Sequence, residues 1–342
     1  MNIKGLKCLI FGGVAAVAAF FTVPAGGSAI DNPSEVLNFC LLDHRGAAHE
    51  LRRVNARVVV LFFTANGCPV ARQSAPKLRA LKETFSSRGV ELFLVNASSG
   101  DDRRSIQKEA RELGLWFIPH LRDDTQGVAR HLRVRRTGEA IAISTADWRI
   151  FYRGAIDDQL VEGAQKPEPT ERLLENALHE FLAGKPVSQP RTAARGCVIH
   201  FEAAARWKDR DVSYAQDIVP ILEKKCVSCH RPGQIGPWAM TSYRKVKSMA
   251  SMIEEVLLAR RMPPWDADRD VARHLNDCAL EIAEAQTLLH WIEQGAPRGE
   301  GEDGLEKLKH EPVPDWPLGA PDIVLKLPRP EQIPATGVLD YR

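Results

Sequence analysis

The sequence lacks any marked imbalance of charge: 46 Lys and Arg stand against 44 Asp and Glu, a net charge of +2 over 342 residues. A chain so nearly neutral gives no indication of a polybasic surface for nucleic acid or for an anionic membrane. It also contains no internal repeat and no low-complexity tract. The hydrophobic share of 44% is that of an ordinary globular protein, and the length indicates two domains plus extensions.

Long apolar runs are missing too, except at the N-terminus. Two lysines precede an apolar run over 8–23, and Gly27 and Ala29 are placed like the small residues before a cleavage site. This order predicts a secretory signal peptide over 1–29. The alternative is an uncleaved anchor helix, although the run is short for a membrane span. Cleavage would leave a periplasmic or secreted protein without a membrane span, in an oxidising compartment.

Cysteine is scarce. The chain has seven, of which Cys8 would leave with the signal peptide. The six that remain are Cys40, Cys68, Cys197, Cys226, Cys229 and Cys278. An even number outside the cytoplasm usually suggests disulfides, whose connectivity a sequence cannot give. The close spacing of Cys226 and Cys229 favours another role for at least those two.

Strands and helices are predicted to alternate after the signal peptide. The expected strands are 36–43, 57–64, 90–96, 140–144 and 148–152, and the expected helices are 69–87 and 101–113. The run over 57–64 (RVVVLFFT) is mainly apolar and rich in β-branched residues, which is typical of a strand buried on both faces. The alternation predicts an α/β sandwich.

Cys68 follows the strand 57–64 and directly precedes Pro69. Proline is favoured at the first position of a helix, where its missing N–H is not needed. The thiol is therefore expected at a helix N-terminus, where free N–H groups and the helix dipole favour the thiolate. A reactive cysteine and a buried, inert one both remain open.

Pro76 comes eight residues after Cys68, and the region ends in the stretch RIFYRGAIDD. With these features residues 34–185 resemble the thioredoxin superfamily, and within it the redoxin group of AhpC/TSA type. The resemblance implies a thioredoxin-like sandwich over 30–185, a nucleophilic role for Cys68 and a helix kinked at Pro76.

Three positions depart from the pattern of that family. Ala71 stands where dithiol members have a second cysteine, Gly138 where the fold usually has a cis-proline, and Ala65 where peroxidase members have a threonine. A single thiol cannot form the local disulfide that two-cysteine exchange uses. Either Cys68 works with a distant cysteine, for which Cys197 is the best resolving candidate, or the domain is a scaffold.

Residues 184–195 (GKPVSQPRTAAR) are polar and contain two prolines, so we predict a linker over 186–210. A helical stretch follows, with Ser213 as a possible cap. Because Pro220 is awkward inside a helix, the helix is expected to begin near Asp217.

This helix leads into the motif C-x-x-C-H, formed by Cys226, Cys229 and His230. Both sulfurs can form thioethers with the vinyl groups of haem, and the histidine can then ligate the iron. The serious alternative is a zinc site of Cys226, Cys229, His274 and Cys278, which leaves His230 without a role. A redox-active C-x-x-C would normally follow a buried strand instead.

A haem of this kind needs a second axial ligand or keeps an open site. Met262 follows a predicted helix over 243–260 and precedes two prolines, which hold the chain extended. The alternatives are Met240, Met249 and Met252. Pro237 or a nearby carbonyl is expected to accept a hydrogen bond from His230 and fix its tautomer.

A final amphipathic helix is predicted over 281–294. A helix, C-x-x-C-H, a loop, a methionine and a last helix form the plan of a class I cytochrome c. Residues 211–300 resemble that family, and especially cytochromes fused to redoxin domains, through the stretches CVSCHRPGQ and RRMPPW. The resemblance implies an all-α cytochrome c domain with one covalent haem c, ligated by His230 and Met262.

The tail over 301–342 is rich in proline and expected to be extended. Its stretch WPLGAPDIVL is similar to the entry of the copper monooxygenase-like domain that follows in such fusions, although the copper histidines are missing. We expect either a truncated entry to that domain or a tail packed on the cytochrome. The implied partners are a redox protein and a copper monooxygenase-like domain or protein.

Three functions remain open. The leading hypothesis is an extracytoplasmic electron-transfer protein with a haem c. The second is a thiol peroxidase or disulfide reductase acting through Cys68. The third is a redoxin domain kept only as a docking module.

Overall fold

The computed structural model describes residues 33, 35–161, 164–265, 267–308, 316 and 319–326. The predicted signal peptide and much of the predicted tail lie outside the described residues. Within them, no helix has both the length and the apolar character to cross a membrane.

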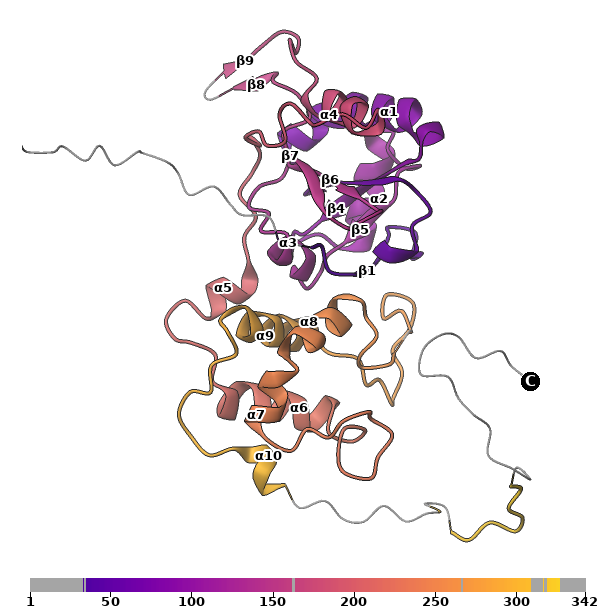
Figure 1. Ribbon diagram of the computed structural model, residues 1–342, viewed down its shortest axis with the longest axis vertical. Coiled ribbons are helices and arrows are strands. Elements are labelled where there is room, and N and C mark those ends of the chain that lie inside the picture. The colour runs from indigo at the N-terminus through magenta and orange to yellow at the C-terminus, as the bar shows by residue number, and fades with distance from the viewer. Residues whose placement is uncertain are drawn as a thin grey trace, which may run out of the picture. The chain divides into compact units, whose positions relative to one another are not determined.

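The elements of the first half form an α/β arrangement (Figure 1). The strands are β1 (Cys40–Leu42), β2 (Ala48–Glu50), β3 (Val58–Thr64), β4 (Val90–Asn96), β5 (His120–Arg122), β6 (Ala140–Ser144), β7 (Ile150–Gly154), β8 (Leu160–Val161) and β9 (Ala164–Gln165). The helices are η1 (Leu51–Arg53), α1 (Pro69–Phe85), η2 (Ser86–Arg88), α2 (Arg103–Glu112), α3 (Gly127–His131) and α4 (Leu173–Leu182). The central sheet has the order β5-β4-β3-β6-β7. Strands β3, β4 and β5 are parallel to one another, and β6 is antiparallel to both of its neighbours, β3 and β7.

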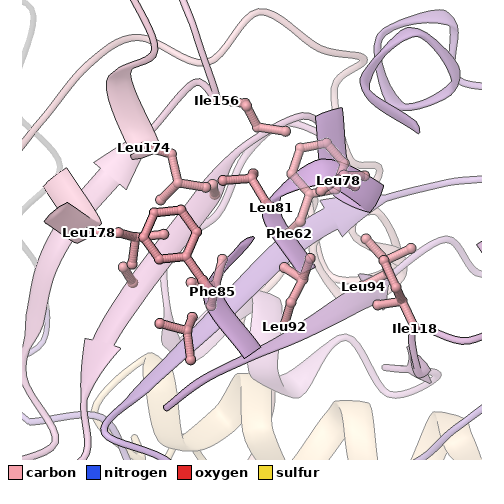
Figure 2. Close-up of a cluster of buried hydrophobic side chains, with 14 of the residues drawn as sticks. Phe62, Leu78, Leu81, Phe85, Leu92, Leu94, Ile118, Ile156, Leu174 and Leu178 are labelled. Atoms are coloured by element: carbon pink, nitrogen blue, oxygen red, sulfur yellow. The ribbon is translucent and has the colours of Figure 1, made fainter. Parts of the chain in front are cut away.

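The alternation of side chains along β3 builds two cores. Val58, Val60 and Phe62 join a buried cluster with side chains of α1 and α4. Figure 2 shows this cluster, in which Phe62 lies among leucines and Phe85. The intervening residues of β3 face the opposite side and pack with α3. A strand buried on both faces therefore reads as one continuous apolar run, as the sequence predicted.

Most of the predicted elements are confirmed within two residues, and β4 and β6 have the predicted bounds. The predicted strand over 148–152 begins later, at Ile150, because Trp148 takes a left-handed backbone conformation (φ 55°) in the turn before it. The predicted strand over 36–43 is shortened to β1, which pairs with β2 alone among the named strands.

The second half is helical. It contains α5 (Glu202–Arg206), a π-helical turn η3 (Tyr214–Ile218), α6 (Val219–Lys225), α7 (Tyr243–Ser248), α8 (Ala250–Leu258), α9 (Ile282–Glu293) and α10 (Gly304–Lys307). Most of these helices enclose a buried cluster around Trp291 and Tyr214. The helical class agrees with the prediction, and identity as a cytochrome c stays a prediction.

The start of this half differs from expectation. Ser213 does cap the chain, accepting a hydrogen bond from the N–H of Gln216 at 3.4 Å. The helical conformation then begins at Tyr214, earlier than the predicted start near Asp217. Pro220 is accommodated because it lies in the first turn of α6, where its missing N–H costs no helical hydrogen bond.

The segment predicted as a linker, 186–210, contains both backbone pairing and a short helix. The N–H of Arg153 in β7 donates to the carbonyl of Pro190, and the N–H of Thr192 donates to the carbonyl of Arg153, both at 3.0 Å. Residues 202–206 form α5. Composition indicated a loop but could not reveal these partners, which lie far away in sequence. The boundaries at 185, 210 and 300 remain predictions.

His120 in β5 makes the stability of this fold depend on pH. Burial lowers the pKa of His120 from its ordinary value of 6.5 to about 4. In the unfolded chain the imidazole of His120 takes up a proton near pH 6.5, whereas in the folded chain it stays neutral. Stability is therefore complete above that pH and falls by about 3 kcal/mol as the pH drops towards 4.

Urea unfolding at pH 7.5, 5.5 and 4.5 measures this loss. His120→Asn should show a smaller decline than the parent protein over the same range. Burial also lowers the pKa of the neighbouring His44, so the variant should keep part of the slope. Equal slopes in the two proteins would show that His120 is not responsible.

Candidate functional site

Cys68 is the N-cap residue of α1, with Pro69 at the first helical position. The buried strand β3 ends four residues earlier and delivers the thiol to the carboxyl edge of the sheet. Pro76 lies inside the helix, as predicted. The side chain of Cys68 is buried, with 3% of its residue surface exposed. The predicted position at a helix N-terminus is confirmed.

Two groups from distant segments meet at this sulfur. Thr137 Oγ1 lies 3.0 Å from Cys68 Sγ. Cys197 Sγ lies 3.5 Å from Cys68 Sγ, although the two cysteines are 129 positions apart. Both are free thiols here, and Cys197 is exposed to solvent. The structure therefore brings the two predicted cysteines together at one place.

The segment that carries Cys197 is held by backbone pairing. Arg136 and Val198 form an antiparallel bridge, and the N–H of Thr137 donates to the carbonyl of Cys197 at 2.9 Å. Gly196 lies so close to this segment that an added Cβ would meet the carbonyl oxygen of Thr137 at 1.8 Å. Only glycine permits that approach, so the sequence around Cys197 is suited to lie against Cys68.

Opposing effects act on the Cys68 thiol. Burial alone would raise its pKa. Hydrogen bonds with Thr137, with the N–H of Ala71 and with Cys197 together outweigh burial, so the pKa of Cys68 ends below its ordinary value. The hydrogen bond with Cys68, together with burial, raises the pKa of Cys197. At neutral pH the negative charge of the reduced pair therefore rests preferentially on Cys68.

Thr137 is the site residue that the sequence reasoning missed. It directly precedes Gly138, the position assigned to the cis-proline slot, and Gly138 has a left-handed backbone (φ 75°). The position expected for a family threonine holds Ala65. The hydroxyl at this sulfur comes instead from the opposite loop. The one signal in the sequence was its place next to Gly138, the position that faces the active cysteine in this fold.

A second group of candidate residues lies at the end of α6. Cys226 is the C-cap of that helix, and the N–H groups of Cys229 and His230 donate to its carbonyl at 3.2 and 2.9 Å. One tight turn thus presents both sulfurs and the imidazole. Cys229 is exposed, and burial followed by the charge of Cys229 raises the pKa of Cys226 to about 12. Cys226 is therefore a neutral thiol at physiological pH.

The imidazole of His230 is buried and oriented. Its Nδ1 lies 2.9 Å from the carbonyl oxygen of Trp238. A carbonyl can only accept, so Nδ1 carries the proton and Nε2 keeps a free lone pair. The Trp238 ring lies 5.3 Å from the imidazole, centre to centre. The acceptor is thus one residue beyond the predicted Pro237, and the donor set suits covalent haem with Nε2 as iron ligand.

Gly236 allows the loop over His230 to close. Its N–H donates to the carbonyl of Cys229 at 2.8 Å, and an added Cβ would meet that oxygen at 2.6 Å and His230 Nδ1 at 2.8 Å. Gly236→Ala is expected to displace the imidazole and to destabilise the fold by about 1–3 kcal/mol.

The measurements are thermal unfolding and the haem content of protein made in a host that attaches haem c. Gly100→Ala is the matched control, since its added Cβ meets nothing closer than 4.0 Å. The same stability and haem content in both variants would contradict the assignment of Gly236.

The predicted methionine ligand lies in the segment after α8. Met262 is 39% exposed and lines a pocket with Leu257 and Trp265. Of the alternatives, Met240 is buried and its N–H donates to the carbonyl of His230 at 2.8 Å, while Met252 is largely exposed. The role of Met262 as an iron ligand stays a prediction.

The zinc alternative required four side chains to converge. In the described part of the chain no three histidine, cysteine, aspartate or glutamate side chains gather as a metal site. The set of Cys226, Cys229, His274 and Cys278 is therefore not assembled in this conformation.

Comparison with known proteins identifies the first half of the chain. Residues 34–154 match the AhpC/TSA family. Thiol-disulfide oxidoreductase ResA from Halalkalibacterium halodurans is 27% identical over 129 residues, which cover 37% of this chain and 72% of that protein. The N-terminal part is thus a thioredoxin-like redoxin domain that resembles thiol-disulfide oxidoreductases.

Solved structures show weaker likenesses. An uncharacterized conserved protein from Geobacillus kaustophilus is 25% identical, with a TM-score of 0.47, covering 51% of this chain and 94% of that one. A secreted disulfide oxidoreductase from Mycobacterium tuberculosis is 15% identical, with a TM-score of 0.31, covering 43% and 95%.

Proposed function

We propose that the redoxin domain is a thiol–disulfide oxidoreductase whose redox couple is Cys68 and Cys197. The observation that carries this proposal is the distance of 3.5 Å between the two sulfurs. A disulfide needs about 2.05 Å, so a small movement of the exposed segment around Cys197 is enough to form the bond. The likeness to a thiol-disulfide oxidoreductase supports the same chemistry.

The couple replaces the local dithiol that the sequence lacks. In the reduced state, hydrogen bonds with Thr137 and with the N–H of Ala71 favour the thiolate form of Cys68 and lower its pKa. Attack of one sulfur of the couple on a partner disulfide gives a mixed disulfide and releases one partner thiolate. Attack by the second sulfur then closes Cys68–Cys197 and releases the other partner thiolate. Two electrons pass from the couple to the partner.

The test is an exchange assay with the full-length protein and a model protein disulfide such as insulin, with dithiothreitol as reductant. The proposal predicts reduction of insulin well above the rate with dithiothreitol alone. A rate equal to that with dithiothreitol alone would contradict the proposal. Hydrogen peroxide as alternative oxidant distinguishes the peroxidase hypothesis, for which consumption of peroxide is expected.

Thr137 is expected to set the pKa of Cys68. Thr137→Val keeps the shape but removes the hydroxyl, so the thiolate loses a charge-assisted hydrogen bond. The midpoint of the pH profile for Cys68 alkylation should move upwards by about one unit. Thr145→Val is the control, because its hydroxyl bonds to the carbonyls of Ala56 and Arg57 and, among the described residues, to no group of the thiol site. An unmoved midpoint would show that Thr137 does not stabilise the thiolate.

We propose as a second function that the helical part carries a covalent haem c and transfers electrons. The observation that favours it is the hydrogen bond from His230 Nδ1 to Trp238, which leaves Nε2 free. Cys226 and Cys229 would hold the group through thioethers, and His230 would ligate the iron, with Met262 as the candidate for a second ligand. When bound, such a haem supplies a one-electron couple.

A visible spectrum of purified protein tests this second function. It is recorded oxidised and reduced, from a host that attaches haem c, and repeated after acid–acetone extraction. A c-type spectrum that survives extraction is expected. Loss of all haem colour, despite competent maturation, would contradict it.

Extracytoplasmic placement is part of both proposals. A disulfide between Cys68 and Cys197 would persist in an oxidising compartment, which is where the predicted signal peptide would send the chain. The partner we propose is a redox protein that exchanges electrons with either site. The copper monooxygenase-like partner stays a prediction.

A further inference from the structure

We propose that Cys197, and not Cys68, is the sulfur that meets the partner in the exchange reaction. This inference rests on the proposed thiol–disulfide function and assigns the roles within it. It reverses the sequence-based assignment, in which Cys68 was the nucleophile and Cys197 the resolving cysteine. The partner it favours is a protein dithiol or disulfide that approaches from solvent.

The first argument is access. Cys68 has 3% of its surface exposed and is covered by Thr137 and by Cys197 itself, whose sulfur lies 3.5 Å away. Cys197 is exposed, and so is the neighbouring Val198 at 68%. Thiol–disulfide exchange requires the attacking sulfur to approach along the S–S axis. In a Cys68–Cys197 disulfide, Cys197 is the sulfur at the solvent-exposed end of the S–S axis, so a partner thiolate can reach only that sulfur.

The second argument is the leaving group. Attack on Cys197 expels Cys68, and exchange is faster when the leaving thiol has the lower pKa. The hydrogen bonds from Thr137 and from the N–H of Ala71 are already in place to receive the negative charge on Cys68. Attack on Cys68 would instead expel Cys197, an exposed thiol that does not lie at the helix N-terminus where Cys68 caps α1. Access and charge stabilisation therefore select the same sulfur.

The steps balance as follows for a partner dithiol. A partner thiolate forms a bond with Cys197 Sγ while the Cys197–Cys68 bond breaks, and its electron pair goes to Cys68. The second partner thiolate then attacks the partner sulfur joined to Cys197. The partner leaves as a disulfide, oxidised by two electrons, and Cys197 leaves as a thiolate that takes a proton from water. The reverse sequence reduces a partner disulfide.

The test compares full-length Cys68→Ser and Cys197→Ser, each reduced and then treated with oxidised glutathione. Peptide mass spectrometry follows the glutathione adduct at the remaining cysteine of the couple. The adduct on Cys197 should form at least about tenfold faster than the adduct on Cys68, because access outweighs thiolate fraction. In urea this difference should disappear, which shows that the fold causes it.

A second measurement uses the unaltered protein in its oxidised state. It is mixed with reduced glutathione and quenched with acid, and the mixed disulfide is mapped. An adduct on Cys197 supports the proposal, whereas an adduct mainly on Cys68 overturns it and leaves the oxidoreductase function standing. Absence of any Cys68–Cys197 disulfide in the oxidised protein would instead overturn the proposed function itself.

Discussion

Replacement of Cys68 by serine is expected to lower the rate of disulfide exchange by about a thousandfold or more, to the background of the assay. The hydroxyl cannot form a disulfide, so no sulfur of the couple can resolve the mixed disulfide of Cys197 with the partner, and only dithiothreitol can release it. The measurement is insulin reduction by dithiothreitol with full-length protein. The haem spectrum of the same variant should be unchanged, since Cys68 lies in the redoxin domain.

Cys278→Ser is the matched control for this experiment. It removes a thiol that belongs to neither proposed site and should leave the exchange rate unchanged. If Cys68→Ser retained the full rate, the redoxin domain would be a docking module and not a thiol enzyme.

Replacement of His230 by alanine is expected to lower the haem content at least about tenfold, and to abolish the low-spin spectrum of any haem that remains. The substitution removes the free Nε2 and the hydrogen bond to Trp238 that orients it. Haem content is measured by the pyridine haemochrome assay on protein from a host that attaches haem c.

His274→Ala separates the haem proposal from the zinc alternative. His274 belongs only to the zinc set and should leave the haem content unchanged. The opposite pattern, with haem intact in His230→Ala and metal lost in His274→Ala, would contradict the assignment of the C-x-x-C-H motif.

The central strands could be predicted because consecutive residues in each of them are apolar, as expected for strands buried on both faces. The runs that became β3, β4 and β6 are mostly apolar, so the type of element did not depend on distant contacts. The short elements β5 and α3 were not predicted. Three and five residues carry too little periodicity, and their conformation depends on pairing with β4 and packing on the sheet.

The two candidate sites differ in how much their sequences disclose. The haem motif is local: Cys226, Cys229 and His230 lie within one turn, so spacing alone predicted the donor set. The thiol site is assembled from three distant segments. Cys68 had a local signal in its following proline, but Thr137 had none, because its role arises only where the loop before β6 meets the start of α1.

From the sequence, the pairing of Cys197 with Cys68 could be predicted only as one of several alternatives. Six cysteines allow many pairings, and the chain between these two is long. What selects Cys197 is the antiparallel pairing of its segment with residues 135–137, and the absence of a side chain at Gly196. Both depend on the folded loop and not on local sequence preference.

The most direct test of the central claim is a disulfide map of the full-length protein, equilibrated in glutathione buffers of increasing oxidising strength and then alkylated. The account predicts that a Cys68–Cys197 disulfide appears in a single reversible two-electron transition, while Cys226 and Cys229 carry haem. If Cys68 stays reduced, or pairs with Cys40 or Cys278 instead, the redox couple proposed for this protein does not exist.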